Sequence, residues 1–108
     1  MTTVPNARLV VKGGRVQSLQ DWMLCGNERL CETRMERDGD GFTFYCERPE
    51  RTVTRRCARA SDAAMGQNLR CQLAYEQLFT LENPTDDELT AVLYDFPILR
   101  RHFDIIRT

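Results

Sequence analysis

The pattern of apolar and polar positions changes about halfway along the chain. Up to residue 58, short apolar runs alternate with polar residues at a period of two, as in β-strands. Beyond residue 60, apolar residues recur every three or four positions, the spacing of one face of an α-helix. Strands followed by helices are typical of an α+β domain. The sequence therefore predicts a single domain over 1–108, strand-rich over 7–58 and helical over 61–107.

Two glycine-containing turns predict β-hairpins in the first half. Gly13 and Gly14 separate two short apolar runs, and both positions of such a turn require a positive φ angle. The second turn, Asp-Gly-Asp-Gly over 38–41, precedes a run in which Phe42, Phe44 and Cys46 share one face.

Two further segments of the first half are less distinct. Residues 18–25 fit either a short helix capped by Ser18 or a strand. Residues 51–57 fit a strand through Val53, and Pro49 suits the start or edge of a strand because it lacks a backbone donor.

The first predicted helix begins at Ser61, a good N-cap residue, and ends before Pro84. Its broad apolar surface suggests packing on more than one side. One predicted face holds Met65, Leu69, Leu73 and Phe79, and the adjoining face holds Cys71, Tyr75 and Leu78.

A second helix is predicted from the capping-box sequence Thr85-Asp86-Asp87-Glu88, in which the first and last residues bond each other's backbone N–H. Pro97 ends it and suits the first position of a third, short helix. The apolar face of the third helix would consist of Ile98, Leu99, His102, Phe103 and Ile106. The expected architecture is thus α+β, a small antiparallel sheet or set of hairpins in the N-terminal half packed against two to three C-terminal helices.

Charge is nearly balanced overall but divided along the chain. The 15 basic and 16 acidic residues give a formal net charge of -1, which argues against a general polyanion binder. Five arginines against Glu50 give the segment 48–59 a net charge of +4, while 76–95 holds six acids and no base, a net charge of -6. These segments supply two candidate binding faces. The first consists of Arg48, Arg51, Arg55, Arg56 and Arg59, and the second of Asp86, Asp87 and Glu88.

The five cysteines do not have the spacing of a zinc site, since they form no close pairs and His102 is the only histidine. No secretory signal is visible at the N-terminus, so a disulfide framework is not expected and the cysteines are predicted to be buried free thiols. The Asp-Gly-Asp-Gly turn has only part of a calcium-loop pattern. We expect no metal and no cofactor.

No catalytic arrangement is recognisable, and His102 falls on a predicted apolar helix face rather than beside a nucleophile. The glycines do not have the spacing of a phosphate-binding loop. The sequence resembles no family that we recognise. The protein is therefore expected not to be an enzyme.

The most favoured function is binding of another macromolecule, most of all a protein, as an inhibitor, immunity factor, adaptor or accessory subunit. Bacterial and phage genomes encode many small binding proteins of this kind. By analogy, the protein could be encoded by a phage or mobile element and directed at a host defence system. The alternative is a nucleic-acid-associated factor that uses the arginines of 48–59, whose charges would contact phosphates. No stretch is long enough to span a membrane, so a cytoplasmic location is expected. A homodimer is a further hypothesis, because a small sheet leaves edges that need covering.

Overall fold

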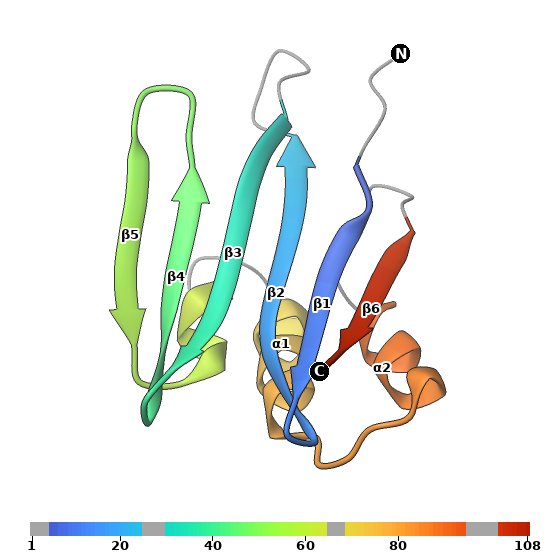
Figure 1. Ribbon diagram of the computed structural model, residues 1–108. Coiled ribbons are helices and arrows are strands. Elements are labelled where there is room, and N and C mark those ends of the chain that lie inside the picture. The colour runs from blue at the N-terminus through green and yellow to red at the C-terminus, as the bar shows by residue number, and fades with distance from the viewer. Residues whose placement is uncertain (1–4, 25–29, 65–68, 95–101) are drawn as a thin grey trace.

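The chain forms one six-stranded sheet with its helices packed on a single face (Figure 1). The computed structural model describes residues 5–24, 30–64, 69–94 and 102–108. The strands are β1 (Ala7–Lys12), β2 (Arg15–Leu24), β3 (Leu30–Asp38), β4 (Gly41–Glu47), β5 (Thr52–Cys57) and β6 (Phe103–Arg107). A 3₁₀-helix, η1 (Ala60–Ala64), precedes the α-helices α1 (Leu69–Thr80) and α2 (Asp86–Leu93).

Strands β1 to β5 form an antiparallel meander, and β6 lies beside β1. The spatial order of the six strands is β5-β4-β3-β2-β1-β6. Both predicted hairpin turns are confirmed. Gly13 and Gly14 have φ angles of 60° and 76°, and Gly39 has a φ angle of 62° beside the paired residues Asp38 and Gly41. The uncertain segment 18–24 is a strand, because it continues β2 alongside β3.

The C-terminal strand corrects the predicted architecture. A third helix was expected over Pro97–Ile106, but Phe103–Arg107 forms β6, which pairs in parallel with β1. The remaining part of that prediction, 97–101, lies outside the described residues. The sheet is therefore mixed and has six strands, and the described residues hold two α-helices. The expected small antiparallel sheet under two to three helices is wrong, because β6 takes the edge of β1 that a hairpin-only sheet would leave open.

Helix α1 also differs from its prediction. It begins at Leu69 rather than as one helix from Ser61, which lies in η1. The predicted face is wrong for Leu69 and Leu73, whose relative exposures are 67% and 59%. Tyr75, Leu78 and Phe79 are buried as predicted, together with Ala74. Met65 lies outside the described residues.

Helix α2 begins as predicted. The Thr85 hydroxyl accepts the Glu88 backbone N–H at 3.1 Å, and the Glu88 carboxylate accepts the Thr85 N–H at 3.2 Å. Leu89, Val92 and Leu93 are buried against the sheet. Capping by both partners satisfies two backbone donors that the first turn would otherwise leave unpaired.

Alternation along the strands places the core on the helix-covered face. Phe42, Phe44 and Cys46 are buried there, as predicted. The rings of Phe42 and Phe79 meet edge to face, with centroids 5.1 Å apart, and join β4 to α1.

Arg37 connects the sheet to the end of α1. Its Nη2 donates to the Phe79 carbonyl at 2.7 Å and to the Val16 carbonyl at 3.1 Å. A cation at a helix C-terminus also meets the negative end of the helix dipole. Burial, and secondarily the charge of Arg15, lowers the pKa of Arg37 below its ordinary value. Arg37 still stays charged at neutral pH, because the ordinary pKa of an arginine lies far above neutrality.

Candidate functional site

The predicted basic segment falls on β5, an edge strand, and its arginines point in different directions. Arg55 lies on the helix-covered face, where its guanidinium stands 5.4 Å from the centroid of the Phe44 ring. The same side chain donates to the Asp62 carbonyl of η1 at 3.0 Å. Arg55 therefore serves to hold η1 against the edge of the sheet.

Arg56 lies on the opposite face and is also engaged within the fold. Its guanidinium pairs with the Asp38 carboxylate at 2.7 Å and with the Asp40 carboxylate at 3.0 Å. These contacts tie β5 to the turn between β3 and β4. The Asp38 and Asp40 carboxylates, which suggested a calcium loop, thus have a cationic partner in the protein itself.

The other three arginines of the segment lie beyond the two ends of β5. Arg48 and Arg51 are exposed in the turn before the strand, and Arg59 is exposed after it. None of the three makes a side-chain hydrogen bond or ion pair within the described ranges. The structure thus distributes the five arginines over both faces and both ends of β5 rather than into one patch.

The acidic segment is likewise used largely within the fold. Asp86 accepts from Arg107 at 2.6 Å, which joins α2 to β6, and Glu88 belongs to the capping box. Glu82 pairs with Arg15 at 3.5 Å, and the Glu76 carboxylate accepts the Ser61 N–H at 3.1 Å. Of the predicted face of Asp86, Asp87 and Glu88, only Asp87 has no hydrogen bond or ion pair of its side chain among the described contacts.

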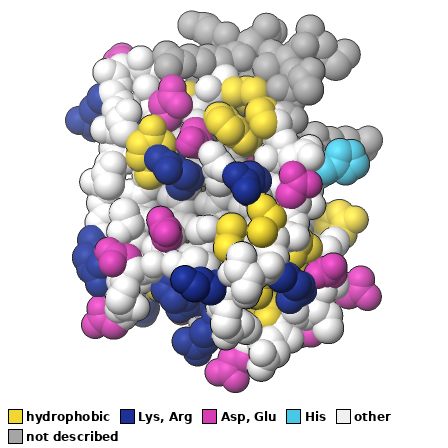
Figure 2. All heavy atoms as spheres, viewed as in Figure 1, with side chains coloured by type: hydrophobic (Ala, Val, Ile, Leu, Met, Phe, Trp, Pro, Cys, Tyr) yellow, Lys and Arg dark blue, Asp and Glu magenta, His cyan; other side chains and the backbone are white. Residues whose placement is uncertain are grey.

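A different surface emerges from the sheet topology. None of the described helices covers the strand face opposite α1, and this face is toward the viewer in Figures 1 and 2. Strand register aligns its side chains in two rows that cross all six strands. We call these two rows the open face. In order from β6 to β5, the first row is Asp104, Arg8, Gln20, Arg34, Tyr45 and Thr54, and the second is Ile106, Val10, Ser18, Glu36, Thr43 and Arg56.

The open face mixes charges of both signs with apolar patches (Figure 2). Arg34 lies over the Tyr45 ring, with its guanidinium 4.4 Å from the centroid, and Val10 lies directly beside Ile106. The pair of Arg34 and Glu32, at 3.4 Å, uses the Nε nitrogen of the arginine rather than the Nη nitrogens at its tip. Such a surface offers apolar contact area as well as polar partners.

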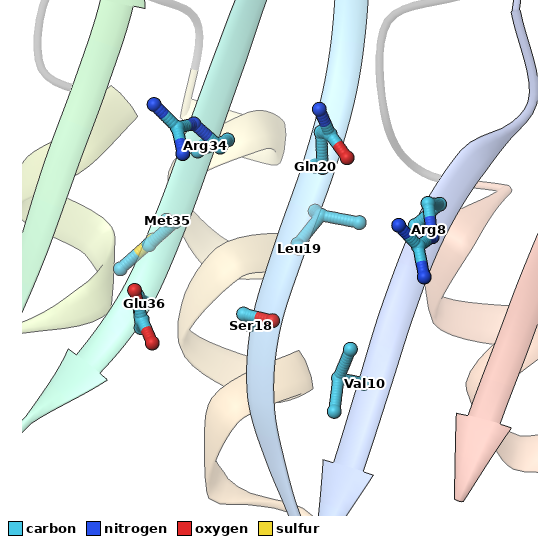
Figure 3. Close-up of a pocket in the computed structure, with 8 residues that line it drawn as sticks. All are labelled: Arg8, Val10, Ser18, Leu19, Gln20, Arg34, Met35 and Glu36. Carbon is cyan, nitrogen blue, oxygen red and sulfur yellow. The ribbon is translucent and has the colours of Figure 1, made fainter.

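A shallow hollow of about 200 Å³ lies in the open face over β1, β2 and β3. It is lined by Arg8, Val10, Ser18, Leu19, Gln20, Arg34, Met35 and Glu36. In the close-up, Arg8 and Arg34 stand on the strands to either side, with Gln20 and Ser18 on the strand between them (Figure 3). Sequence reasoning missed this site because its residues come together only through the register of three strands. Their alternation with buried residues was the one signal available.

The three cysteines whose side chains are described divide into two groups. Cys46 and Cys57 are buried free thiols, as predicted. Cys31 is disulfide-bonded, so the prediction of free thiols is wrong at this position. Its partner lies outside the described side chains. Disulfides are typical of oxidising compartments.

Other candidate chemistry is limited in the described ranges. His102 is exposed just before β6 rather than on an apolar helix face, because the segment is a strand and not a helix. No group of three or more histidine, cysteine or acidic residues there is arranged to hold a metal ion. The helices of the described ranges are too short and too polar to cross a membrane.

Comparison with known proteins returns no match, either to family models, to curated proteins or to solved structures.

Proposed function

We propose that the protein is a non-catalytic binding module that recognises another protein through the open face of its sheet. The observation that carries the proposal is the composition of this face, which combines two cross-strand rows of exposed and half-buried side chains with none of the described helices over them. A sheet face that is not buried in the fold is free to be buried by a partner.

The charge pattern favours a protein over a nucleic acid as the partner. Glu36, Asp104 and Glu32 lie among the cations of this surface, so a chain of phosphates would meet repulsion as well as attraction. Opposed charges on one surface instead suit a partner that carries both signs, because they set register and exclude wrong partners. The runner-up, nucleic-acid binding by the arginines of 48–59, is weakened because Arg55 and Arg56 are engaged within the fold.

Affinity capture with two matched variants tests the proposal. The double variant Val10→Thr, Ile106→Thr removes the apolar strip of the open face while keeping β-branched residues that suit a strand. The control, Leu73→Ala, removes exposed apolar surface from α1 on the opposite side. Lysate of cells that express the protein, with and without nuclease treatment, is passed over each immobilised protein, and captured proteins are quantified by mass spectrometry.

We expect one protein to be retained by the wild type and by Leu73→Ala, and to be reduced about tenfold or more by the open-face variant. Equal capture by all three proteins, or a loss confined to Leu73→Ala, would overturn the open face as the binding surface. Capture that disappears on nuclease treatment would favour the nucleic-acid alternative.

A further inference from the structure

The hollow in the open face has the chemistry of a site for a single carboxylate. Arg8 and Arg34 pair in register with the same residue, Gln20, from the two neighbouring strands. Adjacent strands lie about 4.8 Å apart, so the two arginines start about 10 Å from each other. Side chains of this length can converge on one group placed between them.

The donors around the hollow greatly outnumber its acceptors. Each guanidinium carries five N–H groups in a planar fork that matches a carboxylate in bidentate geometry. The Gln20 amide and the Ser18 hydroxyl add further donors between them. Glu36 is the one acid among the lining residues.

Both arginines can take a ligand. The Arg34 side chain is 54% exposed and pairs with Glu32 through Nε at 3.4 Å. Its guanidinium lies over the Tyr45 ring of β4, 4.4 Å from the centroid, and binding a ligand in the hollow requires it to turn toward β2. Arg8 is exposed and, in the parts of the chain that the structure describes, makes no side-chain hydrogen bond or ion pair. Its neighbour across the strands, Asp104, accepts instead from Asn6 at 3.3 Å.

The surroundings limit the ligand to one negative charge with apolar neighbours. Glu36 inside the hollow and Asp104 beside Arg8 would repel a second anionic group. Val10 lines the hollow and pairs in register with Ile106 on the neighbouring strand, so apolar surface continues from the hollow toward β6. An isolated acidic side chain between aliphatic residues meets both conditions, whereas a phosphate chain meets neither.

We infer that the hollow between Arg8 and Arg34 binds an aspartate or glutamate side chain of the partner protein, flanked there by aliphatic residues. This inference rests on the proposed protein-binding function and names the chemistry of its partner. The arginines supply bidentate, charge-assisted hydrogen bonds, and Val10 and Ile106 contact the flanking aliphatic groups.

A peptide titration followed by NMR tests the inference directly. The probe is acetyl-Gly-Ile-Glu-Ile-Gly-amide, and the matched peptide replaces its glutamate by glutamine. We expect the glutamate peptide to shift the signals of the Gln20 side-chain amide and of the Arg8 and Arg34 Nε–H groups. The dissociation constant should rise about tenfold or more for the glutamine peptide.

Protein variants separate the hollow from general attraction. Arg8→Gln combined with Arg34→Gln should weaken the glutamate peptide by the same factor, and Arg48→Gln, at an exposed arginine beyond the open face, should leave it unchanged. Equal affinity for the two peptides, or equal weakening by Arg48→Gln, would overturn the inference. Stronger shifts with oligothymidylate than with the glutamate peptide would do so as well.

These outcomes are distinct from failure of the proposed function. If Val10→Thr, Ile106→Thr abolishes capture of a partner protein while the two peptides bind alike, the open face remains the binding surface and only the carboxylate site is lost. If no protein is captured at all, the proposed function fails whatever the peptides do.

Discussion

Gly14 shows how one residue can serve both a turn and a tertiary contact. Its carbonyl accepts the Asn83 N–H at 2.7 Å, which joins the β1–β2 turn to the loop between α1 and α2. A Cβ added at Gly14 would lie 2.4 Å from Asn83 Oδ1. Asn83 itself has a φ angle of 46°, a conformation that asparagine tolerates better than most residues. The turn chemistry is visible in the sequence, but the close approach is not.

Replacing each glycine of this turn by alanine separates the two requirements. A Cβ added at position 13 would meet no atom within 4 Å. Gly13→Ala should therefore lower the free energy of unfolding only by the cost of an alanine in the left-handed conformation, about 1 kcal/mol. Gly14→Ala adds the clash with Asn83 and should lower the free energy of unfolding by about 2–4 kcal/mol in total. Urea denaturation of both variants measures the difference. Equal destabilisation would show that the loop moves aside without cost.

At the scale of elements, β6 shows how a strand can resemble a helix in sequence. Phe103 and Ile106 fit helical spacing, but Phe103 and Ile105 also fit a strand face, and these two pack against the core. The Ala7 N–H donates to the His102 carbonyl at 3.0 Å, and the Thr108 N–H donates to the Val11 carbonyl at 2.9 Å, so both ends of β6 are held by β1. A partner almost a hundred residues away decides between the two periodicities.

The helix and the strand make opposite predictions for two adjacent isoleucines. In the strand, Ile105 faces the core and Ile106 faces the open side, whereas the predicted helix placed Ile106 inward. We expect Ile105→Thr to lower the free energy of unfolding by about 1–2 kcal/mol and Ile106→Thr to change it by less than about 0.5 kcal/mol. Thermal and urea unfolding measure both variants. The reverse order would contradict the strand.

At the scale of the whole molecule, two arginines of the basic segment and several acids of the acidic segment hold elements together. Arg55 and Arg56 join β5 to η1 and to the β3–β4 turn, while Asp86 and Glu82 join the helical layer to β6 and β2. The open face draws its charges from β1, β3 and β6, and it shares Arg56 of β5 with the basic segment.

The Cys31 disulfide also concerns the whole molecule. It weighs against the predicted cytoplasmic location, because reducing compartments keep most thiols unpaired. With five cysteines in the sequence, one bridge within the chain leaves three thiols.

Thiol titration and unfolding measurements test the bridge together. Under denaturing conditions, a thiol reagent should count three thiols before reduction and five after it. Reduction should lower the free energy of unfolding by about 2–4 kcal/mol, because it releases a constraint on the unfolded chain. The variant Cys46→Ala, at a buried free thiol, should leave the change on reduction intact. A count of five thiols before reduction would rule out the bridge.

Local sequence is sufficient to predict the features that depend on near neighbours. Turn glycines predicted both hairpins, alternation placed Phe42 and Phe44 inward, and the capping box located the start of α2. Each of these follows from backbone conformation or hydrogen bonds within a few residues.

Features that depend on distant partners follow from the way the chain packs. Pairing with β1 made 103–107 a strand, and packing on the sheet chose which side of α1 is buried, leaving Leu69 and Leu73 exposed. The register of β1, β2 and β3 brought Arg8, Gln20 and Arg34 side by side, although they are spread over more than twenty residues of sequence. Periodicity shows that a face exists, but the free energy of burying it depends on which surface it meets.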